Sequence, residues 1–81
     1  MNQRTVTEVG GWVGVAGILA AYIGVSFGLL GPSDIAYLAL NGCGAILVTV
    51  DAVGQRNWQP ALLNVIWAVV ALVSLVRSLV L

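Results

Sequence analysis

Apolar residues fill this chain in three long runs, and polar residues gather in the short segments between them. The runs extend roughly over Val9–Leu29, Ile35–Val53 and Pro60–Leu81. A helix needs about 20 predominantly apolar residues to cross the hydrocarbon core of a bilayer. The pattern therefore predicts an all-α membrane fold, with three transmembrane helices in a small bundle. No separate soluble domain is left over, so residues 1–81 are expected to form a single integral membrane domain.

Two short connections separate the predicted helices. Residues 30–33 predict a tight turn, in which Ser33 or Asp34 can cap the second helix. Residues 54–59 form the second connection, and Pro60 suits the first turn of the third helix. The tight first turn makes the first and second helices antiparallel neighbours.

Small residues recur on one side of the first predicted helix, at alternating steps of four and three. The set is Gly10, Gly14, Gly17, Ala21, Gly24 and Gly28. Small residues let helix backbones approach closely in a bilayer, where little hydrophobic force drives helices together. We therefore predict that these residues, with Gly44 of the second helix, form helix-packing contacts. Gly11 departs from the stripe.

The other two predicted helices carry most of their polar groups at the same spacing. On the second helix the set is Tyr37, Asn41, Gly44, Val48 and Asp51. On the third helix it is Pro60, Asn64, Trp67, Ala71, Ser74 and Ser78. Polar groups that face hydrocarbon lose their hydrogen bonds, so these faces are expected to turn toward protein or water and the three faces to meet. Thr49 lies off the pattern and is expected to bond to its own backbone.

The helical rise of about 1.5 Å per residue arranges these groups in two layers. We call side A the membrane face that holds the amino terminus and Arg56, and side B the opposite face. The layer about 5 Å below side A is expected to hold Trp12, Asp51 and Asn64. The layer about 10 Å below side B is expected to hold Tyr22, Asn41 and Ser74. Trp67 is expected about 10 Å below side A.

Two interpretations of these layers are open. In the first, Asn41 and Asn64 are interhelical hydrogen-bonding groups that hold the helices together, and this is the interpretation we favour. In the second, the polar groups line a path for a small-molecule substrate. The candidate substrate-binding residues are then Tyr22, Asn41, Asp51, Asn64 and Trp67.

The charged residues near the membrane faces allow similar alternatives. Asp51 lies in the last turn of its helix, where a carboxylate opposes the helix dipole, and acids at this depth are often functional. The alternative is an interfacial residue that Arg56 neutralises. Arg77 and Asp34 both lie near side B, where we expect a structural pair or an arginine that reaches the interface.

Composition agrees with a membrane protein and excludes several functions. The chain is 60% hydrophobic and 7% charged, with a mean hydropathy of +1.06, whereas soluble domains are about 25% charged. Three scattered arginines give no basic surface for nucleic acid. The chain has no His and the single cysteine Cys43, so it supplies neither a metal site nor a nucleophile with its base. We expect no enzymatic activity, no cofactor and no nucleic-acid partner.

The orientation of the chain depends on a few charges. The first apolar run is longer than that of a secretory signal peptide, and Glu8 interrupts the basic segment that such a peptide needs, so we expect no cleavage. Arg4 and Arg56 lie on side A against Arg77 on side B. This difference favours a cytoplasmic amino terminus.

Three strings of the sequence resemble an uncharacterised family of short bacterial membrane proteins with three spans. They are "GWVGVAGILAAY", "LNGCGAIL" and "NWQPALLNVIWA". The matching positions are Gly11, Trp12, Ala21, Tyr22, Leu40, Asn41, Gly44, Ala45, Leu63, Asn64, Val65, Trp67 and Ala68. The resemblance covers nearly the whole chain and implies a multi-pass protein of the bacterial cytoplasmic (inner) membrane. It implies no particular activity.

A looser resemblance is to the SemiSWEETs, bacterial half-transporters of the PQ-loop class that assemble two three-helix units around a sugar path. Asn64 is similar in place to an asparagine of their substrate site, and Val25-Ser26-Phe27 is similar to the end of their first helix. The chain departs from them after Phe27, where Gly28-Leu29 stands in place of Pro-Gln, and it lacks the tryptophan of their second helix. The resemblance implies a triple-helix bundle, and the departures argue against sugar transport.

Three helices are too few to seal a path alone, so we expect a homo-oligomer or a larger membrane complex. We favour a structural or accessory subunit of such an assembly, in contact with the lipid bilayer. A dimeric half-transporter for a small solute of unknown identity is the alternative. A holin-like pore former is less well supported, because the chain ends "RSLVL" without a strongly charged tail.

Overall fold

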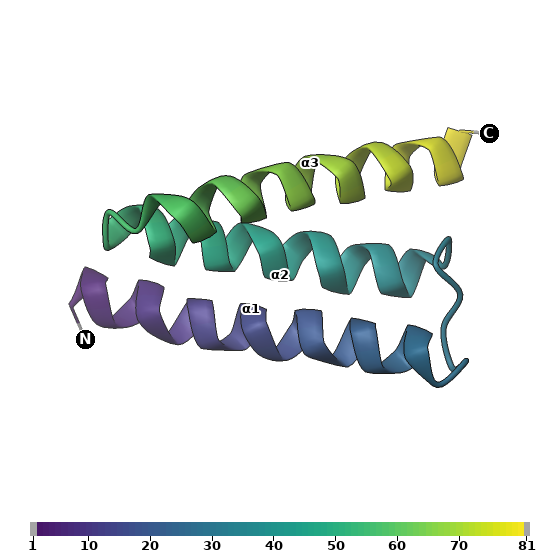
Figure 1. The fold of residues 1–81 in the computed structure, drawn as a ribbon, viewed down its shortest axis with the longest axis horizontal. Coiled ribbons are helices and arrows are strands. Elements are labelled where there is room, and N and C mark those ends of the chain that lie inside the picture. The colour runs from purple at the N-terminus through teal and green to yellow at the C-terminus, as the bar shows by residue number, and fades with distance from the viewer. Residues whose placement is uncertain (1, 81) are drawn as a thin grey trace.

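A computed structural model describes residues 2–80, which form three helices joined by two short connections (Figure 1). Helix α1 spans Gln3–Ser26, α2 spans Ile35–Gly54 and α3 spans Trp58–Val80. Each is long and apolar enough to cross a membrane. The predicted all-α fold with three candidate transmembrane helices is confirmed.

Helix α1 begins well before Val9, the limit predicted from the apolar run. The Asn2 side chain caps the helix by accepting a hydrogen bond from the backbone N–H of Thr5 at 2.8 Å. Because the cap satisfies a backbone N–H group at the helix start, the polar residues before Val9 can form helical turns ahead of the apolar segment. The start of the apolar run therefore does not mark the start of the helix.

The end of α1 is a turn built on glycine. The backbone N–H groups of Leu29 and Leu30 both donate to the Gly24 carbonyl, at 2.8 and 3.0 Å. Gly28 has a φ of +74°, which is the left-handed conformation typical of a helix carboxyl end. The predicted end at Leu29 and the packing role of Gly28 are therefore wrong, because a Cβ on Gly28 would meet nothing within 4 Å.

Helices α2 and α3 begin near the predicted residues. Asp34 occupies the N-cap position of α2, as predicted, but its carboxylate accepts a hydrogen bond from the backbone N–H of Gly31 at 2.7 Å instead of capping the helix. Helix α3 begins at Trp58, and Pro60 lies in its first turn, as predicted. Arg56, with a φ of 55°, lies in the turn between α2 and α3.

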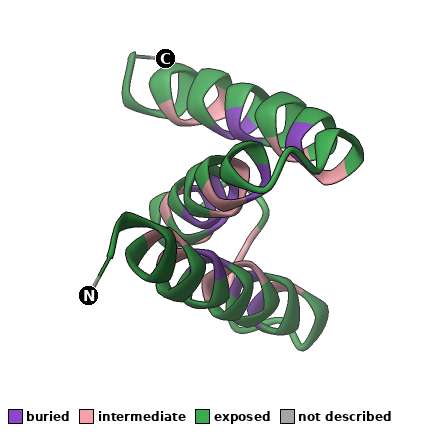
Figure 2. Cartoon of the chain, turned by 90° about the vertical axis from the view of Figure 1, so that its left-hand side faces the viewer, coloured by how far each residue is buried: buried purple, intermediate pink, exposed green. Residues whose placement is uncertain are grey.

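Helix α2 lies between the other two helices (Figure 1). Within residues 2–80, no Cα atom of α1 lies within 8 Å of a Cα atom of α3. Viewed from the end, the three helices form an open row, and the buried positions of α1 and α3 face α2 (Figure 2). The expectation that three faces meet is wrong, because α2 uses two separate faces for its two neighbours.

The α1–α2 interface is a contact between backbones. A Cβ on Gly14 would lie 2.5 Å from the Gly44 carbonyl oxygen, and a Cβ on Gly44 would lie 2.7 Å from that of Gly14. Of the predicted packing residues, Gly14, Ala21, Gly24 and Gly44 are buried. Gly24 packs against Leu30 of the turn, not against α2.

Gly10 and Gly17 of the predicted set lie at the edge of this interface. Both are half-buried, and a Cβ on either would have ordinary contacts at 3.6 Å. The middle of the predicted stripe of small residues is therefore confirmed as a helix contact. The stripe extends beyond the residues that make the closest contact.

The α2–α3 interface is built mainly on alanine. A Cβ on Gly42 would lie 3.3 Å from the Ala71 side chain, and Ala61, Ala68 and Ala71 are the buried residues of α3. The closest contacts of α3 therefore include Ala71, as predicted, and also Ala61 and Ala68, while the predicted Trp67 reaches α2 through its side chain. The smallest side chains take the closest positions.

Candidate functional site

The polar side chains of the three helices gather along a groove between α1 and α3. Helix α2 contacts α1 through Gly44 and Asp51, and it contacts α3 through Asn41 and Gly42. Successive helical residues are about 100° apart, so these two contact faces leave a narrow sector of α2 between them. We call the concave surface over this sector the central groove. Its floor on α2 comprises Tyr37, Asn41, Val48, Asp51, Ala52 and Gln55.

A hollow of about 320 Å³ occupies the side A end of the central groove. Glu8, Trp12 and Val15 of α1 line it, with Val48 and Asp51 of α2 opposite. Trp12 and Asp51 therefore share one site, as the depth count predicted.

Asp51 is held against α1 in this hollow. Its side chain is 18% exposed, and its Oδ1 atom has no hydrogen-bond partner among the described residues. The Arg4 guanidinium lies 3.9 Å from Oδ1 and 4.0 Å from the Glu8 carboxylate, at the outer limit of an ion pair. The alternative in which Arg56 neutralises Asp51 is wrong, because the carboxylate faces α1, where Arg4 is its cationic neighbour.

Gly11 makes room for this carboxylate and was missed in the sequence. A Cβ on Gly11 would lie 2.6 Å from Asp51 Oδ2, and Gly11 is buried. The signal that could have found it is its spacing of three from Gly14, which places both glycines on one helix face.

A hydrogen bond between α2 and α3 lies farther along the groove. The Trp67 indole Nε1–H donates to Asn41 Oδ1 at 2.7 Å, and Asn41 is 8% exposed. The interhelical role predicted for Asn41 is therefore confirmed. The depth count placed Trp67 nearer side A than Asn41, because it counted from Pro60 and ignored the reach of the indole.

Asn64 forms a different kind of bond. Its amide Nδ2–H donates to the Pro60 carbonyl at 2.8 Å, within α3 itself. The interhelical bond predicted for Asn64 is therefore wrong within this chain, and Asn64 does not share a hollow with Asp51. Thr49 likewise donates to the Ala45 carbonyl at 2.7 Å, as predicted for this residue.

Tyr22 and Ser74 lie on opposite walls of the groove. Ser74 and Asn41 line one hollow of about 260 Å³, as their common depth predicted. Tyr22 does not reach them: it lies on α1, which does not contact α3, and its side chain is 68% exposed.

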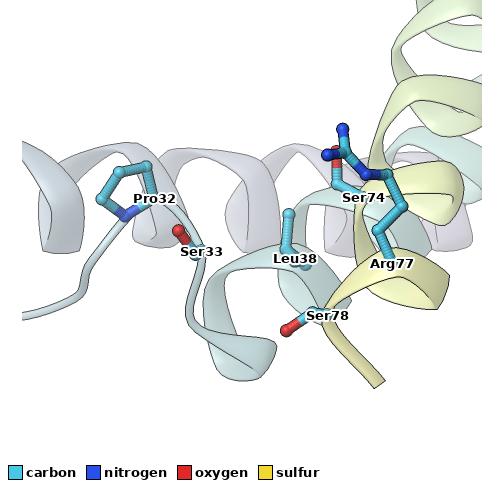
Figure 3. A pocket seen from close by; sticks show the side chains of 6 residues that line it. All are labelled: Pro32, Ser33, Leu38, Ser74, Arg77 and Ser78. Carbon is cyan, nitrogen blue, oxygen red and sulfur yellow. The ribbon is translucent and has the colours of Figure 1, made fainter. Parts of the chain in front are cut away.

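A third hollow, of about 360 Å³, lies near side B (Figure 3). Arg77 and Ser74 of α3 line it, with Pro32 and Leu38 from the first connection and α2. The predicted pair between Arg77 and Asp34 is wrong: no ion pair of Arg77 occurs within residues 2–80, and Asp34 bonds to its own turn.

The chemistry available in the groove is hydrogen bonding and charge pairing. No group of three His, Cys, Asp or Glu side chains that could hold a metal occurs in the described part of the chain. The groove offers carboxylates, an amide and two indoles, which suit contact with a polar helix face or a small solute.

Comparison with known proteins gives a family but no activity. No curated protein and no solved structure matches the chain, so the looser resemblance to the SemiSWEETs gains no support. A family model of an uncharacterised family matches residues 7–80, which include nearly all of the three helices. The chain therefore belongs to this uncharacterised family, as a short protein with three apolar helices fit to span a membrane.

Proposed function

We propose that this protein is a non-enzymatic structural subunit of a membrane assembly, and that the central groove is its docking face. The observation that carries this proposal is the separation of α1 and α3. Both pack on α2 and neither contacts the other in residues 2–80, so the groove between them has no cover within one chain.

The extent of burial supports an assembly. Within the most apolar part of each helix, 22% of α1, 33% of α2 and 11% of α3 are buried. Apolar side chains on the outer surfaces can face lipid without loss. The central groove is different, because the Asp51 carboxylate on its floor is 18% exposed and its Oδ1 has no hydrogen-bond partner within residues 2–80.

Lipid in the groove would place this carboxylate beside hydrocarbon. Backbone and side-chain polar groups in a bilayer core must be paired internally or solvated in a protein-lined cavity. A docked helix, or a second groove that encloses water, meets this requirement. Lipid tails do not.

The test is to fill the groove floor. Val48→Trp places an indole in the side A hollow, whereas Val50→Trp places one about 200° around α2, on the outer surface where Val50 is 50% exposed. Native mass spectrometry from lipid nanodiscs should show the wild-type chain and Val50→Trp in assemblies and Val48→Trp as a single chain. Equal masses for all three proteins would contradict the proposal.

A second candidate function is a path for a small solute. The observation that favours it is the Trp67–Asn41 pair, which puts an amide and an indole at the groove near the middle of the helices. For this function, Asn41→Leu should abolish uptake of a solute into liposomes and leave the native mass unchanged. Thr49→Val is the matched control, because the Thr49 hydroxyl bonds only to its own helix.

We also propose that the protein resides in the bacterial inner membrane with its amino terminus in the cytoplasm. The family resemblance supports the compartment, and the two arginines on side A support the orientation. A reporter that is active only in the periplasm should be silent when fused to the amino terminus. An active reporter there would reverse the orientation.

A further inference from the structure

The charged residues of the chain, and the depths of its polar residues in the membrane, indicate what occupies the central groove. We propose that two copies, related by a two-fold axis parallel to the helices, close a six-helix ring in which α1 of each copy packs against α3 of the other. Glu8 of one copy then pairs with Arg56 of the other. This inference rests on the proposed docking role of the groove and names its partner.

The fold is open in the way that such a ring requires. Helices α1 and α3 flank α2 without contact, and both run from side A to side B (Figure 1). A two-fold axis along the groove places each α1 beside the α3 of the partner, with residues of equal depth at the same level. The polar floors of the two grooves then face each other around the axis.

The charges at side A are self-complementary. The Glu8 side chain is 52% exposed, and its one ion-pair contact within residues 2–80 is the 4.0 Å contact with Arg4. Arg56 is exposed in the turn that leads into α3 and has no ion pair among residues 2–80. In the ring, the side A end of α1 meets the side A end of the partner's α3, so each Glu8 comes near an Arg56 and the symmetry provides two such pairs.

The polar groups near side B also match between copies. Tyr22 lies about 28 Å from the start of α1, and Ser74 lies about 24 Å from the start of α3. They form no hydrogen bond with each other within residues 2–80, where no Cα atom of α1 lies within 8 Å of a Cα atom of α3. In the ring they lie on adjacent helices, where the exposed Tyr22 hydroxyl can bond to Ser74.

The arginines favour a parallel pair. Arg4 and Arg56 lie on side A and only Arg77 lies on side B, so both copies are expected to insert with the same orientation. An antiparallel pair, with its two-fold axis in the membrane plane, would instead pack α1 against the partner's α1 and place Glu8 beside the side B half of that helix. The two arrangements therefore predict different neighbours for Glu8.

Thiol crosslinking between differently tagged copies tests the ring. The background is Cys43→Ser, which removes the single cysteine. Tyr22→Cys in one copy and Ser74→Cys in the other should give a doubly tagged product with a short thiol-reactive linker in membranes. Ala20→Cys is the matched control, because Ala20 lies at nearly the same depth on the opposite side of α1. It should give no product with Ser74→Cys.

Charge reversal gives a second readout. Glu8→Arg should raise the dissociation constant of the pair about threefold to tenfold, since two interfacial charge pairs become repulsive. Glu8→Arg combined with Arg56→Glu in the same chain should restore it. A double variant no tighter than Glu8→Arg would overturn the assigned ion pair.

The native mass separates failure of this inference from failure of the proposed function. A mass of two copies, together with the Tyr22→Cys product, supports the ring. One copy bound at fixed stoichiometry to a different membrane protein would overturn the ring and leave the docking role intact. One copy alone in every lipid would overturn both. A product through Ala20→Cys, or between Glu8→Cys in one copy and Tyr22→Cys in the other, would overturn the groove contact or the parallel orientation respectively.

Discussion

The two interfaces of α2 hold their neighbours by different means. Against α1, Gly14 and Gly44 place each backbone beside the other, so the contact depends on the absence of side chains. Against α3, small alanines bring the helices together and the Trp67–Asn41 hydrogen bond adds a directional contact. One interface is therefore defined by close approach and the other by a specific bond, and substitutions should separate them.

The side A end of α1–α2 combines both features. Gly11 leaves room for the Asp51 carboxylate, because it has no Cβ, and Arg4 is the cation that lies near that carboxylate. A polar group is thus seated in an otherwise apolar glycine interface. A larger side chain should therefore destabilise the interface at two separate positions, Gly11 and Gly14.

The largest effect is expected from Gly14→Val. Its Cβ would lie 2.5 Å from the Gly44 carbonyl oxygen, which is backbone and cannot move aside easily. We expect a loss of about 3 kcal/mol in the free energy of unfolding, at the upper end of overpacking effects. Denaturation of the purified protein in mixed micelles would measure it.

Gly17→Ala is the matched control for this variant. A Cβ at Gly17 would have an ordinary contact at 3.6 Å, so the free energy of unfolding should change by less than about 0.5 kcal/mol. Equal losses for the two variants would show that α1 and α2 do not approach most closely at Gly14.

Trp67→Phe should have the next largest effect. It removes the indole N–H and leaves the Asn41 amide oxygen without its partner, at a loss of about 1 to 2 kcal/mol. Trp58→Phe, at an exposed tryptophan, is the control. In a double-mutant cycle, Asn41→Leu with Trp67→Phe should be less destabilising than the sum of the single variants. Simple additivity would mean that the two side chains do not interact.

Gly11→Ala should destabilise the chain by about 1 kcal/mol, since its Cβ would lie 2.6 Å from an oxygen of a side chain that can partly move. Asp51→Ala in the same chain should recover part of this loss, because it removes the nearest oxygen. Thermal unfolding of the two single variants and the double variant would measure the recovery. No recovery would place Asp51 away from Gly11.

The smallest effect is expected from Asn64→Leu. The Asn64 amide bonds to the Pro60 carbonyl within α3, so its loss should change the stability of the single chain by less than about 0.5 kcal/mol. Unfolding under conditions that keep the chain monomeric is the appropriate measurement. A loss as large as that of Trp67→Phe would show that Asn64 bonds to another helix.

The sequence predicted what depends on periodicity and composition. Apolar length predicted the three helices, and small-residue spacing predicted the contact of Gly14 with α2 and the burial of Ala21. The depth count predicted that Trp12 lies level with Asp51 and that Asn41 lies level with Ser74. These features depend on the helical repeat alone, which is nearly the same in every helix.

What the sequence did not predict depends on side-chain reach and on the order of the helices in space. The Trp67–Asn41 bond joins residues that were expected at different depths, because an indole extends far from its own Cα. Arg4 rather than Arg56 faces Asp51, because α1 begins before its apolar run. The three polar faces do not converge, because nothing in a single helix pattern reveals that α2 has two contact faces.

The central claim is that protein, not lipid, covers the groove in the membrane. Spin labels at Val15→Cys, which lines the side A hollow, and at Val13→Cys, about 200° around α1, each in a Cys43→Ser background, would report collisions with oxygen dissolved in the lipid. The outer position 13 should show the high accessibility of a lipid-facing site, and the groove position 15 a several-fold lower one. Equally high accessibility at both positions would mean that lipid fills the groove, which would contradict the account.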